Sequence, residues 1–203
     1  DAVITTTPSY ILPRLAPSLP DDYLNKLTSA RYLAAVLVIL VLKRPLSHIY
    51  WLNVADPDIP FVGVIEHTNL IPAEHYGGKH IVYLPNYLSP DSRLFHLSHE
   101  ELLQEYLPHL QKINPAFDPS WVETSHYHKV DAAQPIVTTH YSERVPAHRT
   151  PVRGLYLANT TQIYPEDRGT NYSVRLGRKV ARMVLRDFGH AVKGEEFPRP
   201  TIA

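Results

Sequence analysis

The sequence predicts an α+β fold, in which a mixed, mostly antiparallel sheet carries helices on one side. Three observations lead to this prediction. The run Ala34–Leu42 is continuously apolar and rich in valine and leucine, which favours a strand buried on both faces. Several strand-like segments follow it with short connections, which favours an antiparallel meander. Helical patterns that begin near Ser98 and Asn171 supply the covering helices.

The first half of the chain contains the strands of this sheet. Ala2–Thr6 is a short β-like run, and a helix is predicted to open at Pro20, because proline and two aspartates suit a first helical turn. After the apolar run, the predicted strands are His48–Asn53, Phe61–Glu66 and Lys79–Leu84, the last two separated by a loop that contains Gly77 and Gly78.

The second half begins with a capped helix. Ser98 and Glu101 form a capping box, in which each side chain accepts from the other residue's backbone N–H. The predicted apolar stripe of this helix is Leu102, Leu103, Tyr106, Leu107 and Leu110. Asn114-Pro115 ends the helix, His126–Val130 is a further strand, and residues 146–151 form a linker.

The C-terminal stretch reads as strand, loop and helix. Leu155–Ala158 suits a short buried strand, Asn159–Gly169 is a polar loop, and a helix begins at Asn171 and ends at Gly189. Its predicted packing face is Val174, Gly177, Ala181, Val184 and Phe188. A loop that opens into a helix presents free N–H groups, which suit an anion or an electron-rich ring edge. The alternative is an ordinary strand-to-helix connection.

Composition excludes several classes of function. The 203 residues carry a formal net charge of zero, which argues against nucleic acid or an anionic membrane as partner. The absence of cysteine excludes disulfides, thiolate metal sites and cysteine nucleophiles. The longest apolar run is too short for a transmembrane segment, and no secretory signal opens the chain, so we expect a cytoplasmic protein. A start at Asp1, with the one methionine at Met183, suggests a truncated or processed chain.

The twelve histidines raise the question of a metal site. His126 and His128 share a face of their predicted strand, and His96 and His99 lie three residues apart. No His-Glu-x-x-His motif is present, and no carboxylate is spaced to complete a triad. We therefore predict no metal.

The C-terminal stretch also resembles a known family. Gly154–Ala158, Arg168-Gly169, and the small-residue pattern of Leu176-Gly177 with Val180-Ala181 resemble the C-terminal flavin-binding segment of the amine oxidase, protoporphyrinogen oxidase and phytoene desaturase superfamily. In that superfamily the loop and the helix start lie against the isoalloxazine and ribityl parts of FAD. The resemblance implies these cofactor-binding residues: Asn159, Thr160, Arg168, Gly169, Thr170, Asn171 and Tyr172.

The resemblance also implies a domain organisation. Residues 1–153 would form a substrate-binding domain, and residues 154–203 a flavin-contact segment. The chain has no G-x-G-x-x-G motif, so an N-terminal FAD-binding domain is expected as its missing partner in a longer protein. FAD would be bound without a covalent link through cysteine. The fragment alone is expected to lack flavin and to be inactive.

Glu66, His67 and Asn69 follow a predicted strand, where polar groups often line a cleft. In the superfamily this sheet forms the floor of the substrate cavity, which makes these residues and Tyr164 substrate-cavity candidates. The alternative is a hydrogen-bonded turn at a strand end. Catalytic residues remain unassigned. Amine oxidases carry a lysine near the position of Val38, and Ala34–Leu42 has none, so we expect dehydrogenation of an organic small molecule other than a simple amine.

Two other functions fit the same residues. A non-catalytic module that binds a small ligand or a protein would use an aromatic pocket, for which the candidates are Tyr50, Trp51, Tyr83, Tyr87 and Trp121. A flavoprotein similar to the UDP-galactopyranose mutases would share the architecture and catalyse an isomerisation.

Overall fold

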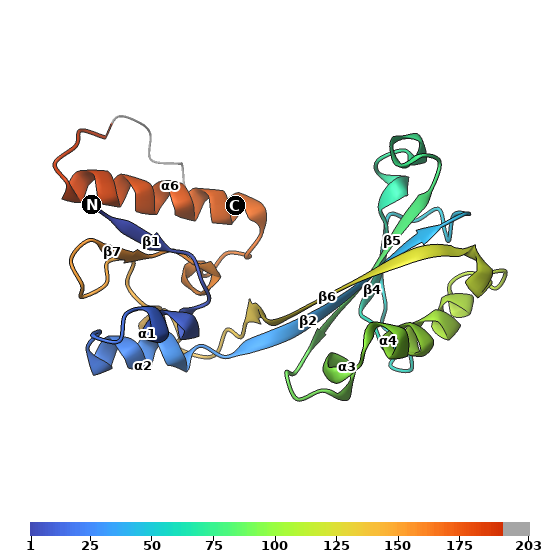
Figure 1. Ribbon diagram of the computed structural model, residues 1–203, viewed down its shortest axis with the longest axis horizontal. Helices are drawn as coiled ribbons and strands as arrows, with labels where there is room; N and C mark the ends of the chain where they lie inside the picture. Colours follow the sequence, from blue (N-terminus) through green and yellow to red (C-terminus); the bar gives the residue numbers. More distant parts are fainter. Residues whose placement is uncertain (193–203) are drawn as a thin grey trace. The chain divides into compact units, whose positions relative to one another are not determined.

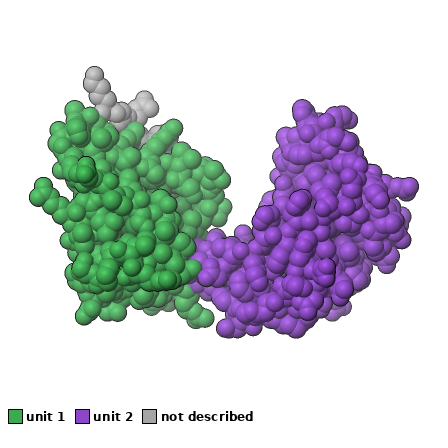
Figure 2. All heavy atoms as spheres, viewed as in Figure 1, with its two compact units in different colours: residues 1–31, 137–203 green, residues 32–136 purple. Residues whose placement is uncertain are grey.

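A computed structural model describes residues 1–192, which form two compact units (Figure 2). Unit 1 comprises residues 1–31 together with the residues from 137 onward, and unit 2 comprises residues 32–136. These boundaries do not coincide with the division predicted at residue 153. The reason is that the first strand of the chain pairs with a strand near residue 155, which joins the two ends of the sequence.

Unit 2 is built on a five-stranded antiparallel sheet in the order β3-β4-β5-β2-β6 (Figure 1). The strands are β2 (Tyr32–Leu42), β3 (Trp51–Asn53), β4 (Gly63–Glu66), β5 (His80–Leu88) and β6 (Val122–Pro135). The predicted α+β class with a mostly antiparallel sheet is confirmed. The meander holds for β3, β4 and β5, but β2 pairs with β5 and β6, so it is a central strand.

β2 is buried on one face, not on both as predicted. Every second side chain is 0% exposed, and these residues are Ala34, Val36, Val38, Leu40 and Leu42. The side chains between them are half-buried. This alternation arises because the helices of unit 2 pack against one face of the sheet, and side chains of a strand point alternately to its two faces.

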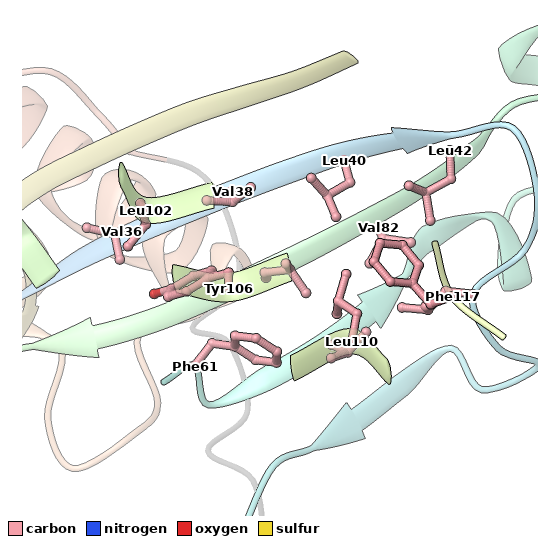
Figure 3. Packing of buried hydrophobic residues seen from close by; sticks show 13 residues of the cluster. Val36, Val38, Leu40, Leu42, Phe61, Val82, Leu102, Tyr106, Leu110 and Phe117 are labelled. Atoms are coloured by element: carbon pink, nitrogen blue, oxygen red, sulfur yellow. The ribbon is translucent and has the colours of Figure 1, made fainter. Parts of the chain in front are cut away.

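The covering helices of unit 2 are α3 (Arg93–His96), α4 (His99–Tyr106) and the 3-10 helix η4 (Leu107–Lys112). The predicted capping box of α4 is confirmed, with Ser98 N–H donating to Glu101 Oε2 at 2.8 Å and Glu101 N–H donating to Ser98 Oγ at 3.3 Å. Leu102, Tyr106 and Leu110 enter the core against the buried side chains of β2 (Figure 3).

Three shorter 3-10 helices complete unit 2: η2 (His67–Asn69), η3 (Ala73–Tyr76) and η5 (Pro119–Trp121). Gly77 and Gly78 follow η3 with φ of 63° and 78°, a left-handed conformation that glycine adopts without strain.

Unit 1 has three layers. The middle layer is a two-stranded parallel sheet of β1 (Val3–Thr5) and β7 (Leu155–Leu157). Leu155 and Leu157 face α1 (Leu12–Leu15) and α2 (Asp21–Ser29), whereas Tyr156 faces α6 (Thr170–Asp187) (Figure 1). The smaller elements are η1 (Ser9–Ile11), α5 (Tyr141–Arg144) and η6 (Thr160–Gln162).

The two edges of this small sheet differ. The outer edge of β7 is bonded to residues 148–150, through Leu157 N–H to His148 O at 2.8 Å and Thr150 N–H to Leu155 O at 3.1 Å. Within residues 1–192, no strand pairs with the outer edge of β1. Because alternate residues of a strand bond to opposite neighbours, the peptide groups of Ile4 face this open edge.

α6 begins one residue before the predicted start and ends in a Schellman motif, with His190 N–H bonded to Leu185 O at 2.9 Å and Gly189 N–H bonded to Arg186 O at 3.1 Å. Its predicted packing face is wrong except at Val184, which is partly buried against the core of unit 1. Val174 and Phe188 are 51% and 41% exposed, and the buried residues are Leu176 and Val180. Both sets have helical spacing, and the position of the sheet decides which set is covered.

No helix among the described residues combines the length and the apolar character that crossing a membrane requires.

Candidate functional site

Asn159, the first predicted flavin contact, stands at the end of β7 and joins that strand to the segment that follows β1. Its Oδ1 accepts the Thr161 N–H at 3.1 Å, and its Nδ2 donates to Thr7 O at 2.8 Å and to Ser9 Oγ at 3.1 Å. The residue is 8% exposed. Its polar side-chain atoms therefore hold the two ends of unit 1 together.

The η6 turn after Asn159 is fixed by a second capping box. Gln162 Oε1 accepts the Asn159 N–H at 3.1 Å, and Gln162 Nε2 donates to Pro146 O at 3.0 Å. Thr160 is half-buried in the first position of this turn. The sequence reasoning missed Gln162, although the spacing Asn-x-x-Gln is the signal of a capping box.

The start of α6 holds the remaining predicted flavin contacts. Gly169 is the N-cap residue with an ordinary φ of −71°, and among the described residues no side chain caps this helix. Thr170 and Asn171 are exposed in the first turn, where no acidic residue is present. The carboxylate at this helix start comes from the preceding loop, since a Cβ on Gly169 would lie 3.8 Å from Asp167 Oδ2.

Asn171 is the second residue of α6, because the helix begins at Thr170 with Gly169 as its N-cap. Its side chain folds back over Gly169. A Cβ on Gly169 would lie 2.7 Å from Asn171 Oδ1, so a larger residue at position 169 would displace the asparagine side chain.

A cavity of about 600 Å³ lies between the loop that precedes α6 and one side of that helix. Its walls are Arg149, Gln162, Ile163, Tyr164, Glu166, Tyr172, Arg175, Leu176, Arg178, Lys179, Arg182, Met183 and Arg186. Of the predicted residues, Tyr164 and Tyr172 line it, whereas Arg168 is half-buried outside it. Arg175 lies 5.9 Å from the centre of the Tyr172 ring and donates to Glu166 at 3.3 Å.

Arg149 lines the cavity, and Asp187 forms an ion pair with it. The Arg149 guanidinium donates to both carboxylate oxygens of Asp187, at 2.7 and 2.8 Å, and the Tyr156 hydroxyl donates to the same carboxylate at 2.8 Å. These bonds, the one from Arg149 first, lower the pKa of Asp187 to about 2. The carboxylate is therefore ionised at neutral pH and orients Arg149.

The predicted substrate-cavity residues of unit 2 hold a turn. Glu66 is 0% exposed and accepts the N–H groups of Leu46 and Ser47 at 3.0 and 2.6 Å. Burial raises the pKa of Glu66, against the opposing effect of these hydrogen bonds. Asn69 Nδ2 donates to Ser47 O and Ile49 O at 3.1 Å each. For these two residues the contacts are those of a hydrogen-bonded turn.

The side chain of His67 has other neighbours than those of Glu66 and Asn69. Its Nε2 lies 2.7 Å from the Tyr76 hydroxyl, and its ring packs edge-to-face against Tyr76 and Tyr83. The structure thus brings His67 to an aromatic group, separate from the Glu66 carboxylate. Tyr164 belongs to unit 1, where its ring lies 5.3 Å from that of Tyr141.

The uncovered face of the unit 2 sheet gathers apolar and aromatic side chains. One row crosses all five strands by pairing register, and it consists of Trp51, Ile65, Tyr83, Ile39 and His126. Tyr83 and Trp51 of the predicted aromatic pocket therefore share this face. Trp121 does not, because it packs on the core beside Phe117 at a ring distance of 5.7 Å.

Within residues 1–192, no three histidine, aspartate or glutamate side chains are grouped in a way that could hold a metal ion.

The comparisons with known proteins agree with the fold. Residues 1–185 match the family model described as flavin containing amine oxidoreductase. Cyclohexylamine oxidase from Brevibacterium oxydans IH-35A has a TM-score of 0.68 and 15% identity, over 92% of this chain and 43% of that one. A reduced UDP-galactopyranose mutase has a TM-score of 0.67 and 15% identity, over 95% and 42%.

Wild-type putrescine oxidase bound to putrescine has a TM-score of 0.65 and 17% identity, over 91% of this chain and 43% of that one. No curated protein matches the sequence significantly. The chain spans about two fifths of the length of the solved structures that it matches, with shares of 42% and 43%. The family model covers most of the sequence, and the chain therefore belongs to the flavin-containing amine oxidoreductase family.

Proposed function

We propose that this chain is the substrate-binding and C-terminal flavin-contact portion of an FAD-dependent oxidoreductase that dehydrogenates an organic small molecule. The observation that carries the proposal is the incompleteness of unit 1 around the start of α6. As far as the described residues go, its sheet has an open edge, and one side of α6 is apolar and exposed. Both features call for a further domain next to the predicted flavin contacts.

The open edge of β1 supports a missing neighbour. Val3 and Ile4 are 61% and 41% exposed, although parallel sheets are ordinarily buried and have more than two strands. A parallel strand from an N-terminal FAD-binding domain would pair with the peptide groups of Ile4. It would also cover the exposed side chains.

The uncovered stripe of α6 supports the same neighbour. We call this set the apolar stripe: Val174, Gly177, Ala181, Leu185 and Phe188, all exposed and spaced along one side of the helix. A Cβ on Gly177 would meet nothing within 4 Å among the described residues. Small residues in the middle of an apolar stripe allow another backbone to approach closely, so this side of α6 suits packing against the FAD-binding domain.

The segment Arg168–Tyr172 fits a flavin. The N–H groups of the first turn, which no side chain among the described residues caps, suit the electron-rich edge of the ring. FAD, when bound, supplies hydride acceptance. The residues of this chain would orient the ring, and the helix start would stabilise negative charge on it. With no cysteine in the chain, no link through cysteine is available.

The substrate would lie against the uncovered face of the unit 2 sheet. Tyr83 and Ile39 are half-buried there, and Trp51 beside them is 56% exposed. His67 adds a ring nitrogen bonded to Tyr76. This composition suits an organic molecule with an apolar body. Glu66 would act indirectly, by fixing the turn at residues 46–47.

The test compares the chain alone with the full-length protein. The chain alone should fold but elute from gel filtration without flavin, and the full-length protein should be yellow.

In the full-length protein, Gly169→Val should reduce flavin occupancy, because the new side chain displaces Asn171 and blocks the backbone from the ring. Flavin absorbance per protein and a thermal melt measure the two effects.

Ser173→Ala is the matched control, since it removes one hydrogen bond to Gly169 O at the same helix start and adds no bulk. It should retain flavin. Stoichiometric flavin on the isolated chain, or full occupancy in Gly169→Val, would contradict the proposal. Conversion of a UDP-sugar by the reduced protein without net oxidation would favour the isomerase alternative.

A further inference from the structure

α6 carries a second surface, formed by cations, and of the predicted flavin contacts only Tyr172 lines the same cavity. We call this set the cationic stripe: Arg175, Arg178, Lys179, Arg182 and Arg186. The residues recur at three- and four-residue spacing, so they share one side of the helix, distinct from both the buried side and the apolar stripe. The whole chain has a net charge of zero, so this concentration of charge is local.

Such a stripe is unfavourable for the helix by itself. Arg175 and Lys179, Arg178 and Arg182, and Arg182 and Arg186 are like-charged pairs four residues apart, and such pairs destabilise a helix. An anion bound along the stripe would remove this repulsion. The stripe rises about 16 Å along the helix axis, which is longer than a single phosphate or carboxylate group.

The stripe faces a hollow. It forms one wall of the cavity of about 600 Å³, and Gln162–Glu166 and Arg149 form others. The volume lies within the range of small-molecule sites, about 300–1,000 Å³. Leu176, Met183 and Ile163 contribute apolar lining, and Glu166 is the one carboxylate among the described lining residues.

Some of the cations that line the cavity are held in place by carboxylates, and others have no recorded ion pair within residues 1–192. Asp187 holds Arg149 and Glu166 holds Arg175, which fixes two guanidinium groups in place. Within residues 1–192, the structure records no ion pair for Lys179 or Arg186. The positive field extends to His148, whose pKa is lowered by burial and then by the charge of Lys179.

We propose that this cavity binds a small ligand with a terminal diphosphate or triphosphate group. Arginine forks match phosphate oxygens in bidentate geometry, and a chain of two or three phosphates, although shorter than the stripe, offers oxygens to cations from successive turns at the same time. A hollow with an apolar lining favours a small ligand over an extended acidic protein segment, which would suit a flat stripe. The proposal does not depend on the flavin function, because Tyr172 is the one predicted flavin contact that lines this cavity and the cations are other residues.

The experiment uses the 203-residue chain without flavin, in about 0.1 M salt, where charges beyond about 10 Å are screened. Calorimetry with inorganic tripolyphosphate should show saturable one-to-one binding, and sulfate at the same ionic strength should not compete. ADP in place of tripolyphosphate tells whether a nucleoside is accepted. Lys179→Gln combined with Arg186→Gln should weaken binding about tenfold or more, since each removes a charge-assisted hydrogen bond.

The matched control is Lys26→Gln combined with Arg31→Gln, which removes two exposed cations of the same unit away from the cavity. It should change the affinity less than about twofold. The proposal would be overturned by no binding at millimolar tripolyphosphate, by equal loss in both double variants, or by tighter binding of an oligoglutamate peptide. Equal competition by FAD would assign the cavity to the cofactor, and would also overturn it.

Discussion

The two units differ in how far each completes its own core. In unit 2, thirteen buried apolar residues form one cluster between the sheet and α4. In unit 1, the buried apolar residues divide into two clusters of five, one on each side of a two-stranded sheet. Among residues 1–192, unit 2 leaves one sheet face uncovered, whereas unit 1 leaves the outer edge of β1 unpaired and the apolar stripe exposed. The difference teaches that unit 2 has the larger single core, and that unit 1 is where we propose a further domain to pack.

The largest expected effect is on the core of unit 2. Val38→Asp places an unpaired carboxylate where the side chain is 0% exposed, and should lower the free energy of unfolding by about 4 kcal/mol or more. Thermal melts followed by circular dichroism measure it, with Val62→Asp at a 44% exposed position as control. A melting temperature within about a degree of the parent would mean that β2 does not carry the core.

The next effect concerns the buried carboxylate that fixes the turn beside this core. Glu66→Ala removes the acceptor of the Leu46 and Ser47 N–H groups, and should cost about 2–4 kcal/mol. Urea unfolding measures the loss. An effect below about 0.5 kcal/mol would show that water replaces the carboxylate and that the turn is independent of it.

The same residue should give unit 2 a pH dependence. Burial raises the pKa of Glu66 in the folded state above its usual 4.5, so its contribution to stability is full below pH 4.5 and is lost as pH rises through the folded pKa. Glu66→Gln cannot ionise. The stability difference between parent and Glu66→Gln should therefore be larger at about pH 4 than at about pH 7. The opposite trend would contradict the raised pKa.

The smallest expected effect is on the uncovered side of unit 1. Val174→Ser in this chain should change stability by less than about 0.5 kcal/mol, because the residue is exposed. Leu176→Ala, two residues away on the buried side of α6, should cost about 2–4 kcal/mol. In the full-length protein Val174→Ser should become destabilising. Equal effects of the two variants in the chain alone would show that the apolar stripe is already packed.

The parts of the fold that depend on neighbouring residues were predictable. The capping box at Ser98 and Glu101, the strand β7 and the left-handed glycine at the end of α6 each arise from a few adjacent residues. Parts that depend on distant segments were not. Val174 and Leu176 both fit a helical stripe, and the sheet that selects Leu176 comes partly from the first five residues of the chain.

The candidate site shows the same limit. The loop and the start of α6 could be located from sequence, but the partners of Asn159 lie about 150 residues away at Thr7 and Ser9. The role of Glu66 depends on a turn twenty residues earlier. The cavity gathers Arg149 and the cations of α6, and their assembly depends on tertiary structure that no local motif records. The flavin contacts themselves stay a prediction.

The pairing of β2 with β6 has a consequence for how such proteins change. The chain leaves unit 1 at residue 31 and returns at residue 137, and the neighbouring residues Tyr32 and Pro135 are partners across two antiparallel strands. Paired residues of this kind lie about 5 Å apart. Unit 2 is thus a cassette with adjacent ends. Because its two ends are adjacent, unit 2 can be replaced by another inserted domain at one short junction. Unit 1 then stays unchanged, while the residues on the surface of the inserted domain vary.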